Sequence, residues 1–187
     1  MYRGYSSRRT EGFTLVELMI VLAIAAILLA LAAPGFRTLI ERNRLQATAS
    51  NLFSSLMLAR SEALKRNQVV WLCKGTATAT SASCDSGSTG VWEGGWLVHI
   101  DPTNPASPDP NDVIAVSLAL QSGDTLRVVE IPSTDTNAIS FRPDGGSSAQ
   151  ASFVLCNADA DTSAGREIRV GVTGRPRLFD SVTSCTP

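Results

Sequence analysis

The sequence has few of the residues and none of the motifs on which most enzymes rely. It contains a single histidine, His99, which stands between two apolar residues, Val98 and Ile100. Neither a Gly-x-Ser-x-Gly elbow nor a glycine-rich phosphate loop occurs in the 187 residues. We therefore expect no catalytic residues, no cofactor and no enzymatic activity, and we interpret His99 as an ordinary strand residue.

The sequence also lacks an excess of positive charge. Its 16 lysines and arginines are outnumbered by 17 aspartates and glutamates, which gives a net charge of −1. Without residues 1–12, which hold three arginines and Glu11, the net charge becomes −3. Nucleic-acid-binding domains usually carry a clear basic excess, so any such binding by this chain must be local.

The four cysteines, Cys73, Cys84, Cys156 and Cys185, lack the short Cys-x-x-Cys spacing that is typical of a zinc site. With only one histidine in the chain, we expect no metal, and instead predict disulfides in a domain that folds outside the cytoplasm. Four cysteines allow three pairings. Sequence nearness favours Cys73 with Cys84, across a Gly/Ser/Thr-rich loop, and Cys156 with Cys185, near the C-terminus.

One long apolar run near the start is the dominant feature that is present. Leu18 to Ala33 are sixteen consecutive apolar residues, and from Phe13 the run is interrupted only by Thr14 and Glu17. As a helix it would be about 31 Å long, close to the hydrocarbon thickness of a bilayer. Three interpretations compete: a secretory signal cleaved at Ala30-Leu31-Ala32, an ordinary membrane anchor, or an anchor that later packs against copies of itself.

The carboxylate of Glu17 bears on this choice. A charged side chain in a membrane helix is costly unless it is paired, although one so near the end can also extend to the interface. Cleavage after Gly12 would give Phe13 a new α-amino group, four residues from Glu17. That amine could pair with Glu17 of the same helix or of a neighbouring subunit, so that assembly would neutralise the charge.

After Pro34 the sequence has the pattern of an amphipathic helix. Apolar residues recur at helical spacing from Ala49 to Leu64, so we expect a helix that kinks at Pro34 and continues to about Asn67. Short β-like runs follow, and they are Val69–Cys73, Trp96–Asp101, Val113–Leu120, Thr125–Ile131, Ala138–Arg142, Ala151–Cys156 and Glu167–Val172. Because no long helical connection separates them, we predict an antiparallel sheet and an α+β fold.

The segment Gly12-Phe13-Thr14-Leu15-Val16-Glu17 resembles the processing and assembly motif of type IV prepilins and type II secretion pseudopilins. The resemblance implies a leader over residues 1–12, cleavage after Gly12 by a prepilin peptidase, and N-methylation of Phe13. It also implies that Glu17 is the assembly glutamate and that Pro34 is the helix-kinking position. The remainder would be a transmembrane and polymerisation helix over 13–40 and a periplasmic domain over 41–187, anchored in the inner membrane and later carried to the cell surface.

Three further segments, Ile40–Gln46, Ala59–Asn67 and Gly95–Val98, extend the resemblance to the minor type IV pilins of the FimT/FimU kind, in the GspH/FimT pseudopilin family. The family implies a long N-terminal helix packed on antiparallel β-structure. Its members assemble with other minor and major pilins in a pilus or in its tip or initiation complex. The alternative is an H-type minor pseudopilin of type II secretion, in a periplasmic pseudopilus and without a role in DNA binding.

Gly174-Arg175-Pro176-Arg177 is a compact basic motif directly after the alternating strand Glu167–Val172. Gly174 and Pro176 suit a turn, and two arginines at such a tip present forked donors to phosphates. The bland interpretation is that these arginines are solvated, or paired with another subunit or with Asp180.

In DNA-uptake members of the family, a matching Gly-Arg-x-Arg motif binds DNA. The resemblance therefore implies that Gly174, Arg175 and Arg177 contact the DNA backbone without sequence preference, during uptake in natural transformation. Arg166 and Arg169 are weaker candidates, which would widen the patch if they share its face.

Overall fold

The structure is a computed structural model that describes residues 13–87, 90–100, 107–121, 123–129 and 137–185. The chain divides into two units, Met1–Ile40 and Glu41–Pro187. The predicted leader and its cleavage position, Gly12, lie outside the described residues.

The described part of the first unit is helical. Helix α1 (Leu15–Arg66) begins beside Thr14, whose Oγ1 accepts a hydrogen bond from the backbone N–H of Glu17 at 3.2 Å. This bond satisfies one of the unpaired donors of the first turn. The helix continues through Pro34, as predicted, whereas the kink at that residue stays a prediction. In the part of the chain that the structure describes, no helix has both the length and the apolar character needed to cross a membrane.

The second unit begins with the remainder of α1, which is amphipathic as expected. Its buried apolar side chains recur every three or four residues, and they are Leu45, Ala49, Leu52, Leu56, Ala59 and Ala63. The helix ends at Arg66, and Asn67 has a left-handed backbone with φ of 55°. A residue in this conformation commonly terminates a helix, and the predicted end near Asn67 is confirmed.

Two antiparallel sheets follow. The five-stranded sheet contains β1 (Val70–Ala77), β2 (Ala82–Cys84), β3 (Trp96–His99), β4 (Val113–Ser117) and β6 (Ala138–Phe141), and a 3₁₀ turn, η1 (Pro110–Asp112), precedes β4. The four-stranded sheet contains β5 (Thr125–Val129), β7 (Ala151–Cys156), β8 (Arg166–Val170) and β9 (Pro176–Phe179), paired in the order β5-β7-β8-β9. This arrangement of a helix with antiparallel sheets confirms the predicted α+β fold.

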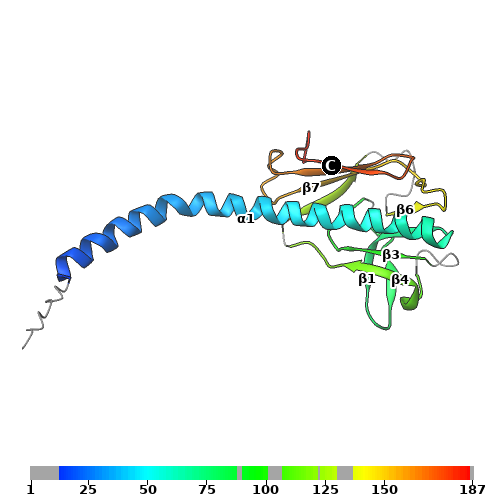
Figure 1. Ribbon diagram of the computed structural model, residues 1–187, viewed down its shortest axis with the longest axis horizontal. Coiled ribbons are helices and arrows are strands. Elements are labelled where there is room, and N and C mark those ends of the chain that lie inside the picture. Colours follow the sequence, from blue (N-terminus) through cyan, green and yellow to red (C-terminus); the bar gives the residue numbers. More distant parts are fainter. Residues whose placement is uncertain (1–12, 88–89, 101–106, 122, 130–136, 186–187) are drawn as a thin grey trace, which may run out of the picture. The chain divides into compact units, whose positions relative to one another are not determined.

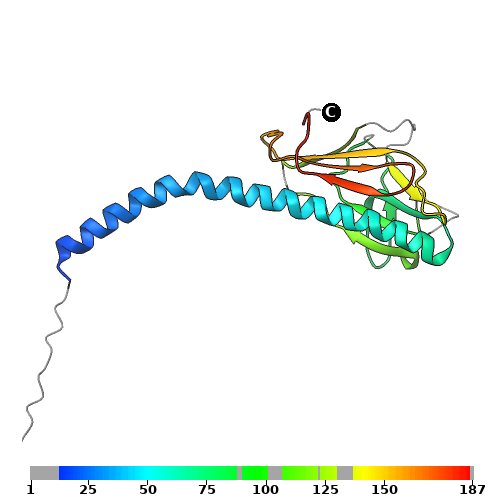
Figure 2. The ribbon, with the colours of Figure 1, turned by 45° about the horizontal axis from the view of Figure 1, so that its top comes forward.

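Both sheets contribute to one hydrophobic core, built on the buried stripe of α1. In Figure 1, β7 of the four-stranded sheet lies above the C-terminal part of α1, whereas β1, β3 and β4 of the five-stranded sheet lie below it, and Figure 2 shows the same elements from a second direction. Trp92 packs edge-to-face against Phe153, with ring centroids 5.2 Å apart. The indole of Trp96 donates a hydrogen bond to Ser55 of α1 at 3.0 Å, so even its polar atom is satisfied within the core.

Besides shorter strand bounds, such as the end of β4 at Ser117 rather than at Leu120, the structure differs from the sequence prediction in two places. First, β1 extends to Ala77 and pairs with an unpredicted strand, β2, so the Gly/Ser/Thr-rich stretch is a hairpin rather than an open loop. Thr78 closes its turn by a backbone hydrogen bond to the Ser81 carbonyl at 2.6 Å. Second, Val172 does not continue β8, because the chain already turns after Val170, and its side chain is exposed. The alternation that suggested a longer strand therefore ends two residues early.

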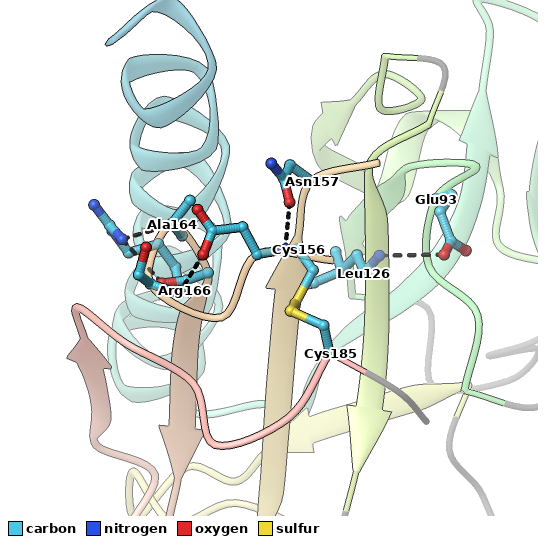
Figure 3. Close-up of a disulfide and its surroundings, with 10 residues drawn as sticks. Glu93, Leu126, Cys156, Asn157, Ala164, Arg166 and Cys185 are labelled. Atoms are coloured by element: carbon cyan, nitrogen blue, oxygen red, sulfur yellow. Dashed lines mark hydrogen bonds between the residues drawn. A yellow bond between two sulfur atoms is a disulfide. The ribbon is translucent and has the colours of Figure 1, made fainter. Parts of the chain in front are cut away.

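The structure pairs Cys73 with Cys84 and Cys156 with Cys185, which is the pairing that sequence nearness favours. Figure 3 shows the second bond, between the last residue of β7 and the C-terminal segment. Such a bond limits the freedom of the unfolded chain and holds an end that would otherwise fray.

Replacing Leu56 by alanine should destabilise the fragment Glu41–Pro187 by about 2–5 kcal/mol, because it leaves a cavity between α1 and the sheets. Leu56 is fully buried, whereas its neighbour Met57 is 41% exposed. Met57→Ala is therefore the matched control and should change the free energy of unfolding by less than about 1 kcal/mol. Urea denaturation followed by circular dichroism measures both values, and equal losses would contradict the assignment of the buried stripe.

Candidate functional site

The motif Gly174–Arg177 lies on the hairpin formed by β8 and β9. Val170 and Pro176 are opposite each other in register, so residues 171–175 form the connecting loop. The backbone N–H of Gly174 donates to the Gly171 carbonyl at 2.8 Å, and Gly174 has a φ of +68°. Glycine adopts this conformation without steric cost, which explains why the sequence has one here. The ring of Pro176 then limits the backbone freedom of the strand that follows.

The loop after β6 packs against this tip. The hydroxyl of Ser147 donates to the Gly171 carbonyl at 2.8 Å. The carbonyl of Gly145 lies so close to Gly174 that a β-carbon there would overlap it. The same carbonyl accepts a hydrogen bond from Nε of Arg60 in α1 at 2.9 Å. The tip is thereby connected to the helix, and its conformation is fixed by contacts far apart in the sequence.

Arg175 and Arg177 are exposed cations at this tip. Arg177 lies directly opposite Arg169 in the β8–β9 register, so their side chains share the outer face of the sheet. Among the residues that the structure describes, neither the side chain of Arg175 nor that of Arg177 has a hydrogen-bond or ion-pair partner. Asp180, which the sequence suggested as a local partner, has its carboxylate 3.9 Å from Nε of Arg166 instead. Both motif guanidinium groups are available to an external anion.

Arg169 shares the face of Arg177 but is held by its own neighbours. Its Nε and one Nη donate to the two carboxylate oxygens of Glu167 at 2.7 and 2.9 Å. Its guanidinium also lies over the ring of Phe179, 4.8 Å from the centroid. Glu167 is only 7% exposed and also accepts a hydrogen bond from Ser152. The hydrogen bonds from Arg169 are the main reason that the pKa of Glu167 lies below its ordinary value, against the opposing effect of burial.

Arg166 lies on the other face of the sheet, since it is an odd number of positions from Arg169. Its Nε donates to Gln46 of α1 at 2.7 Å, and one Nη donates to the Ala164 carbonyl at 2.9 Å (Figure 3). The expectation that Arg166 would widen the patch is wrong on this geometry. Its side chain connects the sheet to the helix, while Arg169 does share the face of the motif.

An open groove of about 680 Å³ follows the outer face of this hairpin. Phe179 also lines it, and its polar lining residues are Gln150, Ser152, Arg169, Thr173, Arg175 and Arg177. Among the described residues that line it there is no histidine, cysteine or carboxylate. Donor groups on an open surface suit the binding of an extended anion.

The residues predicted for processing and assembly lie at the start of α1. Phe13 is 83% exposed and Glu17 is in the first helical turn, also exposed. Large apolar side chains from Leu15 to Leu31 are exposed as well. In the described chain they have no packed core of their own, so this face is open to a partner or an apolar solvent.

The roles of Glu167, Ser152 and Phe179 were not identified from the sequence. The period-two alternation does place Glu167 on the face of Arg169, and this signal alone could have suggested an ion pair. Phe179 and Ser152 come from neighbouring strands, and their positions depend on strand register. The support of Gly174 by Gly145 had no signal in the sequence.

Replacing Gly174 by alanine should destabilise the hairpin by about 1–3 kcal/mol, because the left-handed backbone and the Gly145 carbonyl both oppose a β-carbon. Gly171→Ala is the control in the same loop, since a β-carbon there meets no atom within 4 Å. Hydrogen exchange of the β8–β9 amides should accelerate in the first variant and remain unchanged in the second. Unchanged exchange in both would contradict the close approach of the two loops.

The ion pair of Glu167 should make stability depend on pH. Because its pKa is lowered in the folded state, the carboxylate stabilises the fold above about pH 4–5, and this contribution is lost as the pH falls through the lowered pKa. Glu167→Gln should cost about 1 kcal/mol at pH 7, since Arg169 is half exposed and screened, and progressively less in acid.

Urea denaturation at several pH values measures this dependence. Asp159→Asn removes an exposed carboxylate and should reproduce the wild-type profile. A constant difference between the Glu167→Gln variant and the wild type at all pH values would show that the ion pair does not contribute.

Comparison with known proteins identifies two matching families. The family described as type II transport protein GspH matches residues 48–174, and the prokaryotic N-terminal methylation motif matches residues 7–33. Comparison with curated protein sequences gave no match.

Two kinds of solved structure are similar to this fold. The type IV minor pilin FimU of Pseudomonas aeruginosa (strain PAO1) is 18% identical, covers 78% of this chain and 98% of its own, and has a TM-score of 0.58. The minor pseudopilin EpsH from the type 2 secretion system of Vibrio cholerae is 12% identical, covers 73% of this chain and 96% of its own, and has a TM-score of 0.51.

At these identities the structural likeness shows a common fold, which agrees with the resemblance inferred from the N-terminal motif. The family match spans more than half of the chain and includes the C-terminal part of α1 and most strands. The protein therefore belongs to the GspH family of pilin-like proteins and carries an N-terminal methylation motif.

Proposed function

We propose that this protein is a minor type IV pilin that binds DNA through the Gly174–Arg177 hairpin, in support of DNA uptake during natural transformation. The observation that carries the proposal is the pair Arg175 and Arg177, exposed on a supported hairpin tip and unpaired among the described residues. Membership of the GspH family supports the assembly part of this role.

The hairpin lowers the entropic cost of binding an anion. Gly174 is fixed against Gly145, and Pro176 restricts the backbone between the two arginines. The tip is thus ordered before a ligand arrives, and a guanidinium group can donate two parallel hydrogen bonds to a phosphate. Both arginines then act on the sugar–phosphate backbone, which carries no base sequence information.

The charge balance of the site predicts weak, salt-sensitive binding. Glu167 neutralises much of the charge of Arg169, so Arg175 and Arg177 supply most of the net positive charge on this face. The chain as a whole is acidic, with a net charge of −3 once residues 1–12 are removed. Several copies or neighbouring subunits would therefore raise the overall avidity.

Delivery and assembly form the other part of the proposal. A prepilin peptidase cleaves after Gly12, and Phe13 becomes the methylated N-terminus. The helix over residues 13–40 holds the precursor in the inner membrane, with the domain over 41–187 in the periplasm. The helix then packs against the helices of other pilins, and Glu17 pairs there with an N-terminal amine. The exposed apolar side chains of this segment and the N-terminal methylation motif support these steps.

A second candidate is an H-type minor pseudopilin of type II secretion. The family description and the likeness to EpsH favour it, because both refer to that system. In this role the same helix would assemble into a periplasmic pseudopilus, and the hairpin arginines would contact protein neighbours rather than DNA. Adjacent genes distinguish the two: minor-pilin genes favour the pilus, and a secretion operon favours the pseudopilus.

Arg175→Ala/Arg177→Ala should weaken DNA binding by about tenfold or more, because it removes the phosphate contacts. The measurement is fluorescence anisotropy of the fragment Glu41–Pro187 with two duplexes of unrelated sequence, at two or more salt concentrations. The wild type should bind both duplexes equally, and log K should fall against log salt with a slope of about −2, as two phosphate contacts predict.

The matched control is Lys65→Ala/Arg66→Ala, which removes the same charge from the exposed end of α1. It should retain binding. An equal loss in both double variants would assign binding to net charge instead of to the hairpin. Absence of binding by the wild type would leave assembly as the function and favour the pseudopilin candidate.

A further inference from the structure

The geometry points to a latent metal site formed by Cys73, Cys84 and His99, which binds a thiophilic divalent cation such as Zn²⁺ when the Cys73–Cys84 disulfide is reduced. The two sulfur atoms and one imidazole nitrogen all lie within 4.8 Å of one another. Nε2 of His99 is 3.6 Å from Sγ of Cys84. The three residues are separated by up to 26 positions in sequence but converge in the five-stranded sheet.

Strand register brings them together. Cys73 of β1 is opposite Leu97 of β3, so His99, two residues further along β3, projects from the same face. On the other side, Gly75 of β1 is opposite Cys84 of β2. A β-carbon on Gly75 would overlap the backbone at Ser83 and Cys84, so a glycine is required for β2 to approach this closely.

The spacing of the donors suits tetrahedral coordination. Zinc binds thiolates at about 2.3 Å and imidazole at about 2.0 Å, which places neighbouring donor atoms roughly 3.5–4 Å apart. The separation of 3.6 Å between His99 and Cys84 already falls within this range. The two Cα atoms of the cysteines are 5.7 Å apart. Once the sulfur–sulfur bond is broken, a small rotation of the two side chains therefore moves the sulfur atoms apart to the separation that a zinc ion needs.

Two thiolates and one imidazole form a ligand set typical of zinc, and they leave the fourth position for water. Cys73 and His99 are buried, whereas Cys84 is partly exposed and offers the ion a path from solvent. The buried ligands shield one side of the bound ion, and the exposed side of Cys84 leaves the fourth coordination position open to water.

The reaction that opens the site is thiol–disulfide exchange. A dithiol reductant transfers two electrons to the Cys73–Cys84 bond and becomes a disulfide itself, leaving two protein thiols. Zn²⁺ then displaces the two thiol protons and binds the thiolates, so two protons are released for each ion bound. A disulfide oxidant reverses the process: it accepts two electrons from the thiolates and two protons, becomes a dithiol, and the Cys73–Cys84 bond forms again as Zn²⁺ is released. The disulfide and the metal are alternative occupants of one pair of cysteines.

The second disulfide provides an internal control. Among the described residues, only one group of three or more histidine, cysteine or acidic side chains is close enough to hold a metal ion, and it consists of Cys73, Cys84 and His99. Cys156 and Cys185 belong to no such group. Reduction of both disulfides should therefore create one specific site per chain, although it frees four thiols.

Co²⁺ titration of the full chain in neutral detergent tests this inference, after reduction with a dithiol and its anaerobic removal. We expect one equivalent of Co²⁺ to give the visible bands of a tetrahedral complex and a thiolate charge-transfer band, both displaced by Zn²⁺. The oxidised protein should give neither. Zn²⁺ should also slow alkylation of Cys73 and Cys84 but not of Cys156 and Cys185, as mass spectrometry of the peptides would report.

Three variants separate a specific site from binding by an unfolded chain. Cys156→Ser/Cys185→Ser should keep the tetrahedral spectrum, and Cys73→Ser/Cys84→Ser should lose it. His99→Gln should weaken Zn²⁺ binding by about tenfold or more, since even residues that only support a ligand have effects of this size. Equal binding by both double cysteine variants, or no tetrahedral spectrum in the reduced wild type, would overturn the inference.

Discussion

Burial of one apolar stripe on α1 is the constraint on which the folded domain depends. From Leu45 to Ala63 the helix presents side chains to both sheets, and these residues are almost completely excluded from water. Neither sheet has a second layer of its own among the described elements, so each requires this helix to cover its inner face. At about 25 cal/mol per Å² of apolar surface, this shared burial outweighs any single polar contact in the domain. The polar links of Arg60 and Arg166 then orient loops that the hydrophobic core holds in place.

The same packing distinguishes the arginines of the C-terminal hairpin. Alternation along β8 directs Arg166 toward the helix and Arg169 toward the outer face, where Glu167 and Phe179 hold it. Arg175 lies in the loop between β8 and β9, and Arg177 lies opposite Arg169 in β9. Neither side chain forms an ion pair with a described acidic residue. Four arginines that are close in sequence therefore have three different environments. A net acidic protein can in this way keep a small basic surface, because the competing carboxylates are already occupied.

The two disulfides illustrate how similar bonds can have different chemical surroundings. Cys156–Cys185 joins the end of β7 to the C-terminal segment. Cys73–Cys84 lies across a hairpin within a sheet and beside the imidazole of His99. The absence of a Cys-x-x-Cys motif argued against a metal, but that argument considers spacing along the chain only. Strands that pair antiparallel bring together ligands from three separate segments, for which no short motif exists.

The sequence by itself determined the class of protein, the α+β architecture and most of the elements, because periodicity and turn residues are local properties. The helix end at Arg66, the strand β7 and the hairpin motif Gly174–Arg177 could all be located in this way. Tertiary structure alone decided the strand β2, the position of Phe179 beside Arg169 and the contact of His99 with Cys84. Each depends on which strands become neighbours and in what register. That choice is made by burial of side chains distant in sequence, and a local pattern does not contain it.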